Sequence, residues 1–480
     1  MDSSLTSIPA PKKLQIAMFP WLAFGHMIPF LEVAKLMAQK GHHVYFISTP
    51  RNIDRLPKLP SHLLPFITFV KLPFPADQNL PENAEATSDI PLDKMPYLKK
   101  AHDELQQPLS DFLESNSSLD WIIYDFAPFW LPPMAAKKGI RRVFLSIFNA
   151  WSLCLFGSTA EDMVNGYDPR SEPEHFTVTP QWVTFPTKLA FPLYDAKRYI
   201  SSANQPNVSG VSDLYRCGSV IQGSDLLAIR SCMELEPEWL NLYGDLHRKQ
   251  VVPLGLLPPS VEVQAEKDES WIEINKWLDE QGKESVVYVA LGSELTLSQQ
   301  ELTELALGLE LSGLPFFWAL RIRKGLDAAG SEQPSLKLPD GFEDRVKGRG
   351  IVWTRWAPQL RILNHESVGG FLTHCGWSSV IEGLLFGCPL VMLPFMLDQG
   401  LNARVMGERN VGVVVPRKDD EDGLFTRDDV ADSIRLVMAD EQREGKISYR
   451  EEARKMGKLF GDRKLHQKYM DDFMKQLLVN

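Results

Sequence analysis

Short apolar runs alternate with helical stretches twice along this chain, and this repeated alternation constrains its fold more than any other feature. In the first half, apolar residues recur at helical spacing over residues 29–39, and β-rich runs occupy residues 14–19, 43–48, 66–70, 121–124 and 142–146. Such alternation predicts βαβ units and a parallel sheet covered by helices on both faces. The stretch 150–220 is rich in aromatic residues and proline, so we expect loops and irregular helices that shape a ligand pocket.

Residues 252–269 predict a linker, because three prolines precede an acidic polar run. The alternation then restarts, with a helix at 298–311 and strands at 285–291, 316–320, 351–354, 370–373 and 390–393. The predicted fold class is α/β, with two Rossmann-like domains facing each other across a cleft. We expect an N-terminal domain at 1–251, a C-terminal domain at 270–455, and a C-terminal helix at 456–480 that packs back on the N-terminal domain.

Charge and cysteine content exclude several classes of protein. The 480 residues carry a net charge of 51 − 62 = −11, which disfavours nucleic-acid binding and means that an anionic ligand needs a local trap. The five cysteines form no C-x-x-C pair, so neither a disulfide framework nor a zinc site is indicated. Residues 1–13 do not resemble a signal peptide, and no apolar run reaches the length of a membrane span. We therefore expect a cytosolic protein, a monomer without a membrane span.

The segment 356–399 carries the densest chemical signal. A buried strand at 370–373 leads through a small turn at 374–379 into a helix at 380–386, which presents free backbone amides and a positive dipole end to an anion. Ser378 and Ser379 can cap this helix or donate hydroxyls to a phosphate, and His374 adds another donor. Taken singly, each residue has a plainer interpretation: Ser378 as an N-cap, His374 as a satisfied loop histidine, and Trp356 as a core residue.

As a set, these residues resemble the UDP-sugar signature of plant secondary-product glycosyltransferases, which begins with WAPQ, contains HCGW and ends with DQ at the same spacing. The resemblance extends from the N-terminal GH motif to the C-terminal helices, and it implies the GT-B fold, with an N-terminal acceptor-binding and a C-terminal UDP-sugar-binding domain. It implies that Trp356 stacks on the uracil, that Ala357 and Gln359 bind the base edge or ribose, and that Glu382 binds the ribose hydroxyls. It further implies that the diphosphate binds at Ser293, His374, Gly376, Trp377, Ser378 and Ser379, and that the transferred sugar binds at Asp398 and Gln399. Many members have asparagine where this chain has Ser378.

His26 and Asp125 complete the implied site. His26 is expected in the loop between the first strand and the first helix, and Asp125 follows the strand at 121–124. Taken alone, such a histidine is more often a surface residue and such an aspartate a helix cap. The resemblance makes them the catalytic base and the residue that orients it. The implied reaction is a single displacement with inversion that uses a UDP-sugar as co-substrate and no metal; the acidic clusters at 419–422 and 428–429 look like solvated turns.

Aromatic side chains gather near both motifs and predict an apolar acceptor. The expected acceptor pocket comprises Trp21, Phe24, Phe126, Phe129, Phe148, Asn149, Trp151 and Phe191. Residues 50–56 and 377–379 resemble the branch of the family that extends a sugar already attached to a terpenoid, steroid or flavonoid. Gln399 favours UDP-glucose as donor; UDP-rhamnose, and transfer directly to an aglycone, stay open.

Two other classes of protein compete with this interpretation. A nucleotide-sugar 2-epimerase would share the architecture but would convert the UDP-sugar without an acceptor. A non-catalytic sensor of nucleotide sugars is disfavoured by the presence of both His26 and Asp125, since binding alone needs neither.

Overall fold

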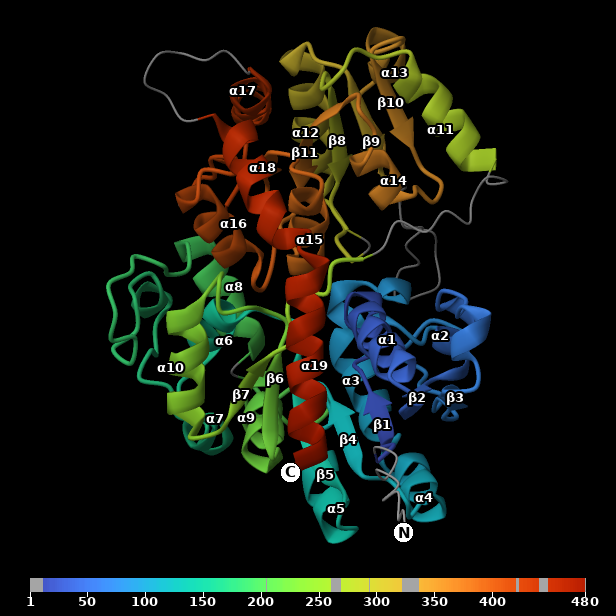
Figure 1. Cartoon of the computed structure of the whole chain (residues 1–480). Helices are drawn as coiled ribbons and strands as arrows, with labels where there is room; N and C mark the ends of the chain where they lie inside the picture. Colours follow the sequence, from blue (N-terminus) through green and yellow to red (C-terminus); the bar gives the residue numbers. More distant parts are fainter. Residues whose placement is uncertain are drawn as a thin grey trace, which may run out of the picture.

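A computed structural model describes residues 12–203, 205–259, 269–292, 294–321, 336–419, 423–439 and 448–479. They form two parallel sheets, one in each half of the molecule, with helices packed on the faces of both (Figure 1). The predicted α/β architecture with two Rossmann-like halves is confirmed.

The N-terminal sheet has seven strands in the order β3-β2-β1-β4-β5-β6-β7. Its strands are β1 (Gln15–Phe19), β2 (His43–Ser48), β3 (Ile67–Lys71), β4 (Trp121–Tyr124), β5 (Arg141–Ser146), β6 (Leu226–Ile229) and β7 (Val251–Pro253). Its helices are α1 (Phe24–Gln39), α2 (Pro50–Arg55), α3 (Met95–Asp103), α4 (Gln106–Ser115), α5 (Leu131–Lys137), α6 (Ala150–Phe156), α7 (Ala160–Asn165), α8 (Leu193–Ala203), α9 (Asp213–Gly223) and α10 (Pro237–His247). The chain moves outward from β1 in one direction and from β4 in the other, so a crevice opens at the carboxyl ends of these two neighbours.

The C-terminal sheet repeats this arrangement with six strands in the order β10-β9-β8-β11-β12-β13. Its strands are β8 (Val286–Ala290), β9 (Phe316–Ala319), β10 (Gly350–Trp353), β11 (Val368–Thr373), β12 (Leu390–Met392) and β13 (Gly412–Val414). Its helices are α11 (Glu269–Asp279), α12 (Gln299–Ser312), α13 (Phe342–Arg345), α14 (Gln359–Leu363), α15 (Trp377–Leu385), α16 (Gln399–Glu408), α17 (Arg427–Met438) and α18 (Tyr449–Phe460). In this sheet the chain moves outward in opposite directions from β8 and β11, which are paired neighbours.

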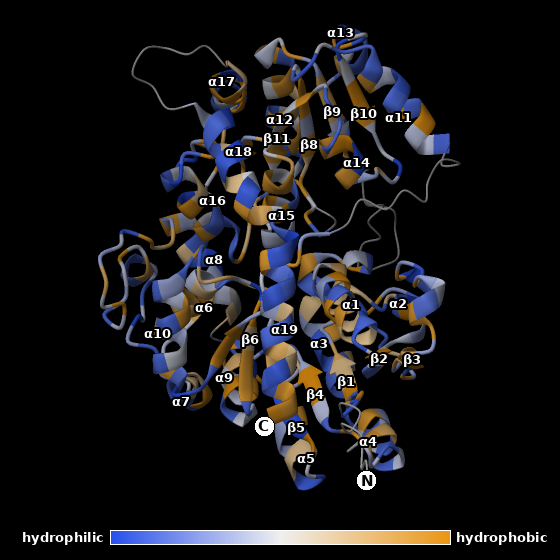
Figure 2. Cartoon of the chain, viewed as in Figure 1, coloured by the Kyte–Doolittle hydropathy of each residue, from blue (hydrophilic) through white to orange (hydrophobic). Residues whose placement is uncertain are grey.

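The strands are apolar because both faces of each sheet are covered. All residues of β4, β6, β8 and β11 are buried, and the strands appear as hydrophobic bands between more polar helices in Figure 2. This is the pattern expected of a parallel sheet with helices on both sides. The three-residue strands β7 and β13 lie at sheet edges and are too short for periodicity to reveal.

Helix α1 begins earlier than predicted, which changes the setting of His26. We expected the helix at 29–39 and His26 in the preceding loop; that placement is wrong. The carbonyl of Ala23 accepts from the amides of His26 (2.9 Å) and Met27 (2.8 Å), so His26 lies in the first helical turn. The apolar face of the helix continues upstream of Pro29, since Met27 is fully buried against the sheet.

The predicted linker at 252–269 begins inside the N-terminal sheet. Val252 and Pro253 belong to β7, and Leu254 and Leu256 are fully buried. Residues 260–268 lie outside the described residues.

The end of the chain returns to the N-terminal half. Helix α19 (Arg463–Val479) runs along that half in Figure 1, and its residues Met470, Phe473 and Leu477 share a buried cluster with β1 and α1. The indole N–H of Trp121 donates to the Leu477 carbonyl at 3.0 Å. This helix therefore links the last residues of the chain to the centre of the first sheet.

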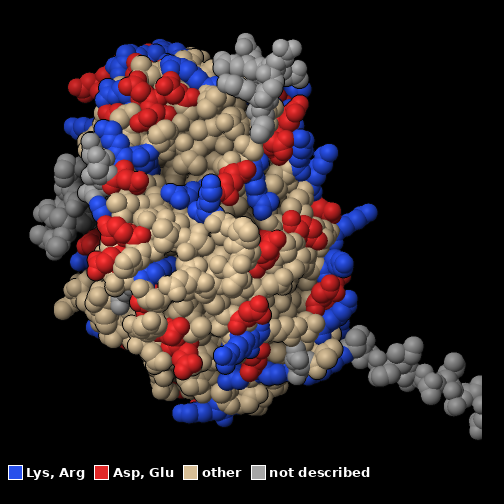
Figure 3. All heavy atoms as spheres, turned by 90° about the vertical axis from the view of Figure 1, so that its left-hand side faces the viewer, with Lys and Arg blue, Asp and Glu red and all other residues tan. Residues whose placement is uncertain are grey.

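The surface face in Figure 3 shows acidic and basic side chains interspersed around a broad uncharged area. Among the helices in the described ranges, none combines the length and apolar character that a bilayer crossing requires.

Candidate active site

The centre of the N-terminal crevice is a histidine–aspartate pair. β1 and β4 are paired in register, Phe19 beside Tyr124, so the residues that follow them emerge at one edge of the sheet. Asp125 follows β4 directly, and His26 lies in the first turn of α1. The Nδ1 of His26 and the Oδ2 of Asp125 are 2.5 Å apart, and both residues are buried.

Two backbone amides fix the Asp125 carboxylate. Its Oδ1 accepts from the amide of Phe126 at 2.6 Å, and its Oδ2 accepts from the amide of Trp21 at 3.3 Å. With both oxygens held as acceptors, the ring of His26 must donate from Nδ1. In the neutral imidazole the remaining nitrogen, Nε2, is then an unprotonated proton acceptor.

The charges around His26 favour its protonated form. Burial lowers the pKa of the imidazole, but the Asp125 carboxylate opposes burial, and Glu294 and Asp398 add to it, so the pKa is raised above its ordinary value of 6.5. Glu294 and Asp398 belong to the C-terminal half. The two halves therefore bring a cluster of carboxylates together around one imidazole.

The opposing lobe presents the beginning of α15 after β11. The helix begins at Trp377, three residues before the predicted start, and its N-cap is Gly376, with no side-chain cap. Because Gly376 rather than a serine is the N-cap, the plainer interpretation of Ser378 as a cap is wrong. The first amides of this nine-residue helix lack helical partners, which is the arrangement that binds anions.

His374 is enclosed between two glycines. A Cβ added at Gly292 or at Gly376 would lie 2.8 Å or 2.6 Å from the His374 Nε2, so a larger residue at either position would displace the imidazole ring. Burial lowers the pKa of His374 to about 4, which keeps the ring neutral. Its buried Nδ1 has no hydrogen-bond partner within the described chain, so the plainer interpretation of a satisfied loop histidine does not hold.

The residues expected at the nucleoside form a connected group. Gln359 donates to the Glu382 Oε2 at 2.6 Å, and the Tyr288 hydroxyl donates to the Gln359 Oε1 at 3.2 Å. Burial raises the pKa of Glu382. Trp356 is 71% exposed, so it is not a core residue, and Ala357 packs partly buried beside it.

The residues expected at the transferred sugar open helix α16. Asp398 is buried, which raises its pKa to about 7, and its Oδ2 accepts from the Asn402 amide at 2.7 Å. The Oε1 of Gln399 accepts from the amides of Phe395 (2.9 Å) and Met396 (3.1 Å). The Gln399 carbonyl is thus engaged, and its NH₂ group is the part left to donate.

Asn402 joins the two halves immediately beside this site. Its Oδ1 accepts from Asn149 Nδ2 at 2.6 Å and from Trp151 Nε1 at 3.0 Å, while its amide donates to the Cys375 carbonyl and to Asp398. Asn149 also caps α6, accepting from the Ser152 amide at 3.1 Å.

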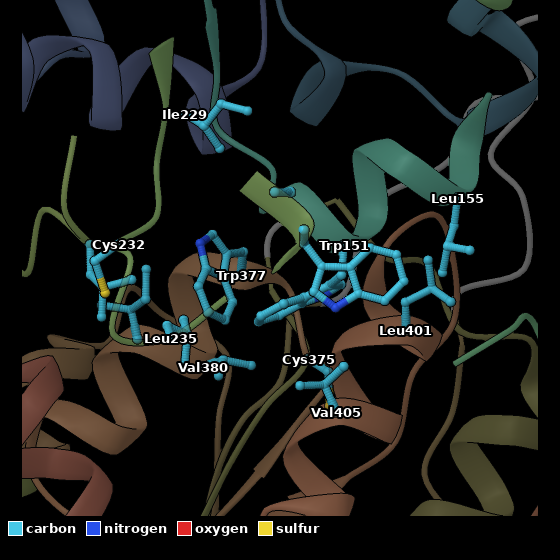
Figure 4. Packing of buried hydrophobic residues seen from close by; sticks show 14 of the residues in the cluster. Trp151, Leu155, Ile229, Cys232, Leu235, Cys375, Trp377, Val380, Leu401 and Val405 are labelled. Carbon is cyan, nitrogen blue, oxygen red and sulfur yellow. The ribbon is translucent and has the colours of Figure 1, made fainter. Parts of the chain in front are cut away.

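Two expected acceptor-pocket residues are therefore interface core instead. Asn149 is fully buried with both ends of its amide engaged, and Trp151 is 1% exposed. The Trp151 ring packs edge-on against Trp377 at 5.2 Å, within the mixed cluster of Figure 4, to which both halves contribute. The prediction was wrong here because the interface between the halves buries residues that would otherwise face the cleft.

Of four other expected acceptor residues, two lie near the His26 ring and two are buried in the core. Phe126 and Phe148 are partly buried, and the centroids of their rings are each 5.8 Å from the His26 ring. Trp21 and Phe191 are buried core residues, Trp21 against Phe126 and His102, and Phe191 stacked on Tyr199; placing them in the lining of the pocket was wrong.

Phe24 and Phe129 are partly buried but packed beneath cations. The Arg55 guanidinium lies 4.8 Å from the Phe24 ring, and that of Arg216 lies 5.1 Å from the Phe129 ring.

Some predicted positions fall outside the described residues. Ser293 and residues 420–422 are among them. The neighbour of Ser293, Glu294, accepts from the Thr87 hydroxyl of the N-terminal half at 2.9 Å. Within the described ranges, no group of three or more histidine, cysteine or carboxylate side chains could hold a metal ion.

Sequence reasoning missed three residues that the structure brings to this site: Arg230, Glu294 and Asn402. Arg230 follows the apolar strand β6, so its position at a strand end was a usable signal, the same one that identified Asp125. Nothing in the local sequence marks Asn402, because its partners are 253 and 251 residues away.

Comparison with known proteins agrees with this architecture. Residues 259–468 match the family described as "UDP-glucoronosyl and UDP-glucosyl transferase". UDP-glycosyltransferase 91D2 of Stevia rebaudiana is 49% identical over 480 residues, covering 100% of this chain and 98% of its own length. Soyasaponin III rhamnosyltransferase of Glycine max is 44% identical over 483 residues, covering 99% of this chain and 98% of its own length. The structure of Arabidopsis thaliana UGT89C1 complexed with UDP-L-rhamnose is 26% identical, with a TM-score of 0.71 and coverage of 97% of this chain and 100% of that one.

Two facing Rossmann-like halves of this kind define the GT-B class of fold. The chain belongs to the UDP-glycosyltransferase family of plants and is an enzyme of that family.

Proposed function

We propose that this enzyme transfers a sugar, with inversion, from a UDP-sugar to a hydroxyl of a small natural product, with His26 as general base and Asp125 as the residue that orients it. The observation that carries the proposal is the 2.5 Å contact between His26 Nδ1 and Asp125 Oδ2, with Glu294 and Asp398 of the other half near enough to act on the same imidazole. Nε2 takes the proton of the acceptor hydroxyl, and the acceptor oxygen forms a bond to the anomeric carbon. The bond from that carbon to the diphosphate oxygen breaks on the opposite face, and UDP leaves with the electron pair.

The donor occupies the C-terminal half in this proposal. Trp356 stacks on the uracil, Ala357 and Gln359 bind the base edge or ribose, and Glu382 accepts from the ribose hydroxyls. The diphosphate is bound by His374, Ser378, Ser379, Ser293 and the backbone of Gly376 and Trp377. The helix end stabilises the negative charge that develops on the diphosphate as it leaves. Asp398 and the Gln399 amide bind the sugar hydroxyls. No step needs a metal ion.

We propose that the acceptor is a glycoside whose sugar hydroxyl reaches His26 while its apolar body contacts Phe126 and Phe148. Support comes from the name of the Glycine max relative, a rhamnosyltransferase of a saponin. Glucose is the proposed donor sugar, because Gln399 keeps a free amide to donate to sugar hydroxyls. Rhamnose is the second candidate, favoured by that same relative and by the UDP-L-rhamnose in the structural neighbour.

We further propose the domain limits 1–251, 252–269, 270–455 and 456–480, with β7 extending the first domain to residue 253. The protein acts in the cytosol as a monomer.

The test is a screen of donors against acceptors, with product mass and anomeric configuration as readouts. UDP-glucose, UDP-rhamnose and UDP-galactose are each offered with terpenoid and flavonoid monoglycosides and with the matching aglycones. We expect an inverted glycosidic bond, faster reaction with the monoglycosides, and activity unchanged by a chelator. Faster reaction with bare aglycones would contradict the acceptor proposal. Conversion of the UDP-sugar without any acceptor would instead indicate an epimerase.

A further inference from the structure

Arg230 extends from the N-terminal half into the beginning of α15. It follows β6, its carbonyl accepts from the Trp377 indole N–H at 3.0 Å, and its Nη1 lies 2.6 Å from the Ser378 Oγ. Its Nε donates to the Leu256 carbonyl at 3.0 Å, and only 4% of the residue is exposed. The side chain is therefore held in one orientation, with the end of its guanidinium group against the donor-site helix.

The contact with Ser378 has a fixed direction. A guanidinium group has only donors, so the Ser378 Oγ must be the acceptor. The hydroxyl hydrogen of Ser378 is then not used toward Arg230 and is available to a third group. A hydroxyl that accepts from a cation is also a stronger donor, because hydrogen bonds polarise one another.

The charge of Arg230 is retained in this buried position. Burial lowers its pKa to about 10, and Glu382 and Glu32 oppose the effect of burial, so the group is cationic at neutral pH. Both carboxylates belong to elements that border the site, α15 and α1. A buried cation at a helix N-terminus, where the dipole end is itself positive, needs anions nearby; Glu382 and Glu32 supply part of that compensation, and a bound diphosphate would add to it.

We propose that Arg230 is a positioning residue, supplied by the opposite half of the enzyme, that orients and polarises the Ser378 hydroxyl, which in turn donates to the diphosphate of the UDP-sugar. The inference rests on the proposed function, since it assumes that UDP binds at the beginning of α15. It explains how Ser378 replaces the asparagine that many family members have. Arginine and serine together supply the hydrogen bond to the phosphate that a single side-chain amide supplies in those members. It also makes donor binding depend on both halves being in contact.

The experiment is calorimetric titration of the full-length protein with UDP and with uridine, which lacks phosphates. In Arg230→Gln, we expect UDP affinity to fall about 10- to 100-fold, the scale of a lost charge-assisted hydrogen bond, and uridine affinity to stay within about threefold of wild type. Arg230→Lys keeps the charge, so its affinity for UDP should lie between those of wild type and Arg230→Gln. Adding Ser378→Asn to Arg230→Gln should restore most of the UDP affinity, because the amide can donate directly to the phosphate.

Arg409→Gln is the matched control. Arg409 is a partly buried arginine that also bridges the halves, donating to the Leu235 carbonyl at 2.6 Å, but it lies at the far end of α16. We expect this variant to bind UDP and uridine like wild type. If Arg230→Gln lost affinity for UDP and for uridine equally, or lost affinity for neither, the assignment would be overturned and Arg230 would be a structural bridge. Wild-type protein that binds UDP no better than uridine would instead refute the proposed diphosphate site itself.

Discussion

Replacing Asp125 with asparagine tests the catalytic pair while leaving the shape of the side chain almost unchanged. The Phe126 amide is 2.6 Å from Oδ1, whereas the Trp21 amide is 3.3 Å from Oδ2, so the stronger of the two hydrogen bonds holds the oxygen at the Oδ1 position. The new NH₂ group must then occupy the position of Oδ2 and face His26. It can only donate, so Nδ1 becomes the acceptor and the ring proton moves to Nε2. The nitrogen that should take the proton from the acceptor is then already protonated.

The expected loss follows from that tautomer and from the missing charge. A misplaced proton, together with loss of the carboxylate that stabilises the imidazolium, reduces kcat by about two to four orders of magnitude. This corresponds to about 3–5.5 kcal/mol of transition-state stabilisation. UDP affinity should change less than about threefold, because Asp125 is not among the residues of the proposed donor site.

Steady-state kinetics with the best donor and acceptor from the screen, together with titration by UDP, measure both quantities. Asp120→Asn is the control: this residue precedes the same strand at the opposite edge of the sheet, where it accepts from the Gln15 amide at 2.9 Å. It should retain nearly full kcat. A kcat for Asp125→Asn within tenfold of wild type would refute the argument from the tautomer. An equally large fall in UDP affinity would show that Asp125 has a structural role.

Four further predictions rest on the described geometry. kcat/KM should rise with pH through an apparent pKa above 6.5, since only neutral His26 accepts a proton; a rate that stays flat down to pH 5 would contradict this. The same pairing of His26 contributes stability that is complete below about pH 6.5 and is lost as pH rises through the raised pKa, which denaturation at several pH values would measure. Trp356→Ala should weaken UDP and uridine alike, by about 10-fold or more in titrations, without lowering Tm, because the ring is 71% exposed; Leu436→Ala, also exposed, is the control. Asn402→Leu should cost about 3–5 kcal/mol of unfolding free energy in denaturant titrations, because four buried hydrogen bonds lose a partner, whereas exposed Asn241→Leu should cost little.

Much of the architecture was determined by local sequence. Strands β2 and β4 occupy the predicted residues, because each is a short apolar run that only a covered parallel sheet can bury. The strand, turn and helix at residues 368–385 were also predictable, although the helix begins three residues early. Gly376 is the N-cap of this helix, and glycine is one of the residues commonly found at that position.

Tertiary structure decided which side chains face the cleft. Trp151 and Phe126 are both aromatic residues that follow a strand, and the sequence does not distinguish them. Trp151 is buried because α15 and α16 of the other half pack over it, whereas the Phe126 ring stays partly exposed beside His26. Such a difference depends on contacts between residues more than 200 positions apart, which no local pattern contains.

The same holds for the charges of the site. Local sequence determined that a histidine follows the first strand and that an aspartate comes directly after the strand at 121–124, but not that Glu294 and Asp398 would lie near enough to raise the pKa of that histidine. Nor did it determine that Arg230 would reach Ser378, 148 positions away. Electrostatic interactions act through space, so their strength was set only when the two sheets came to face each other.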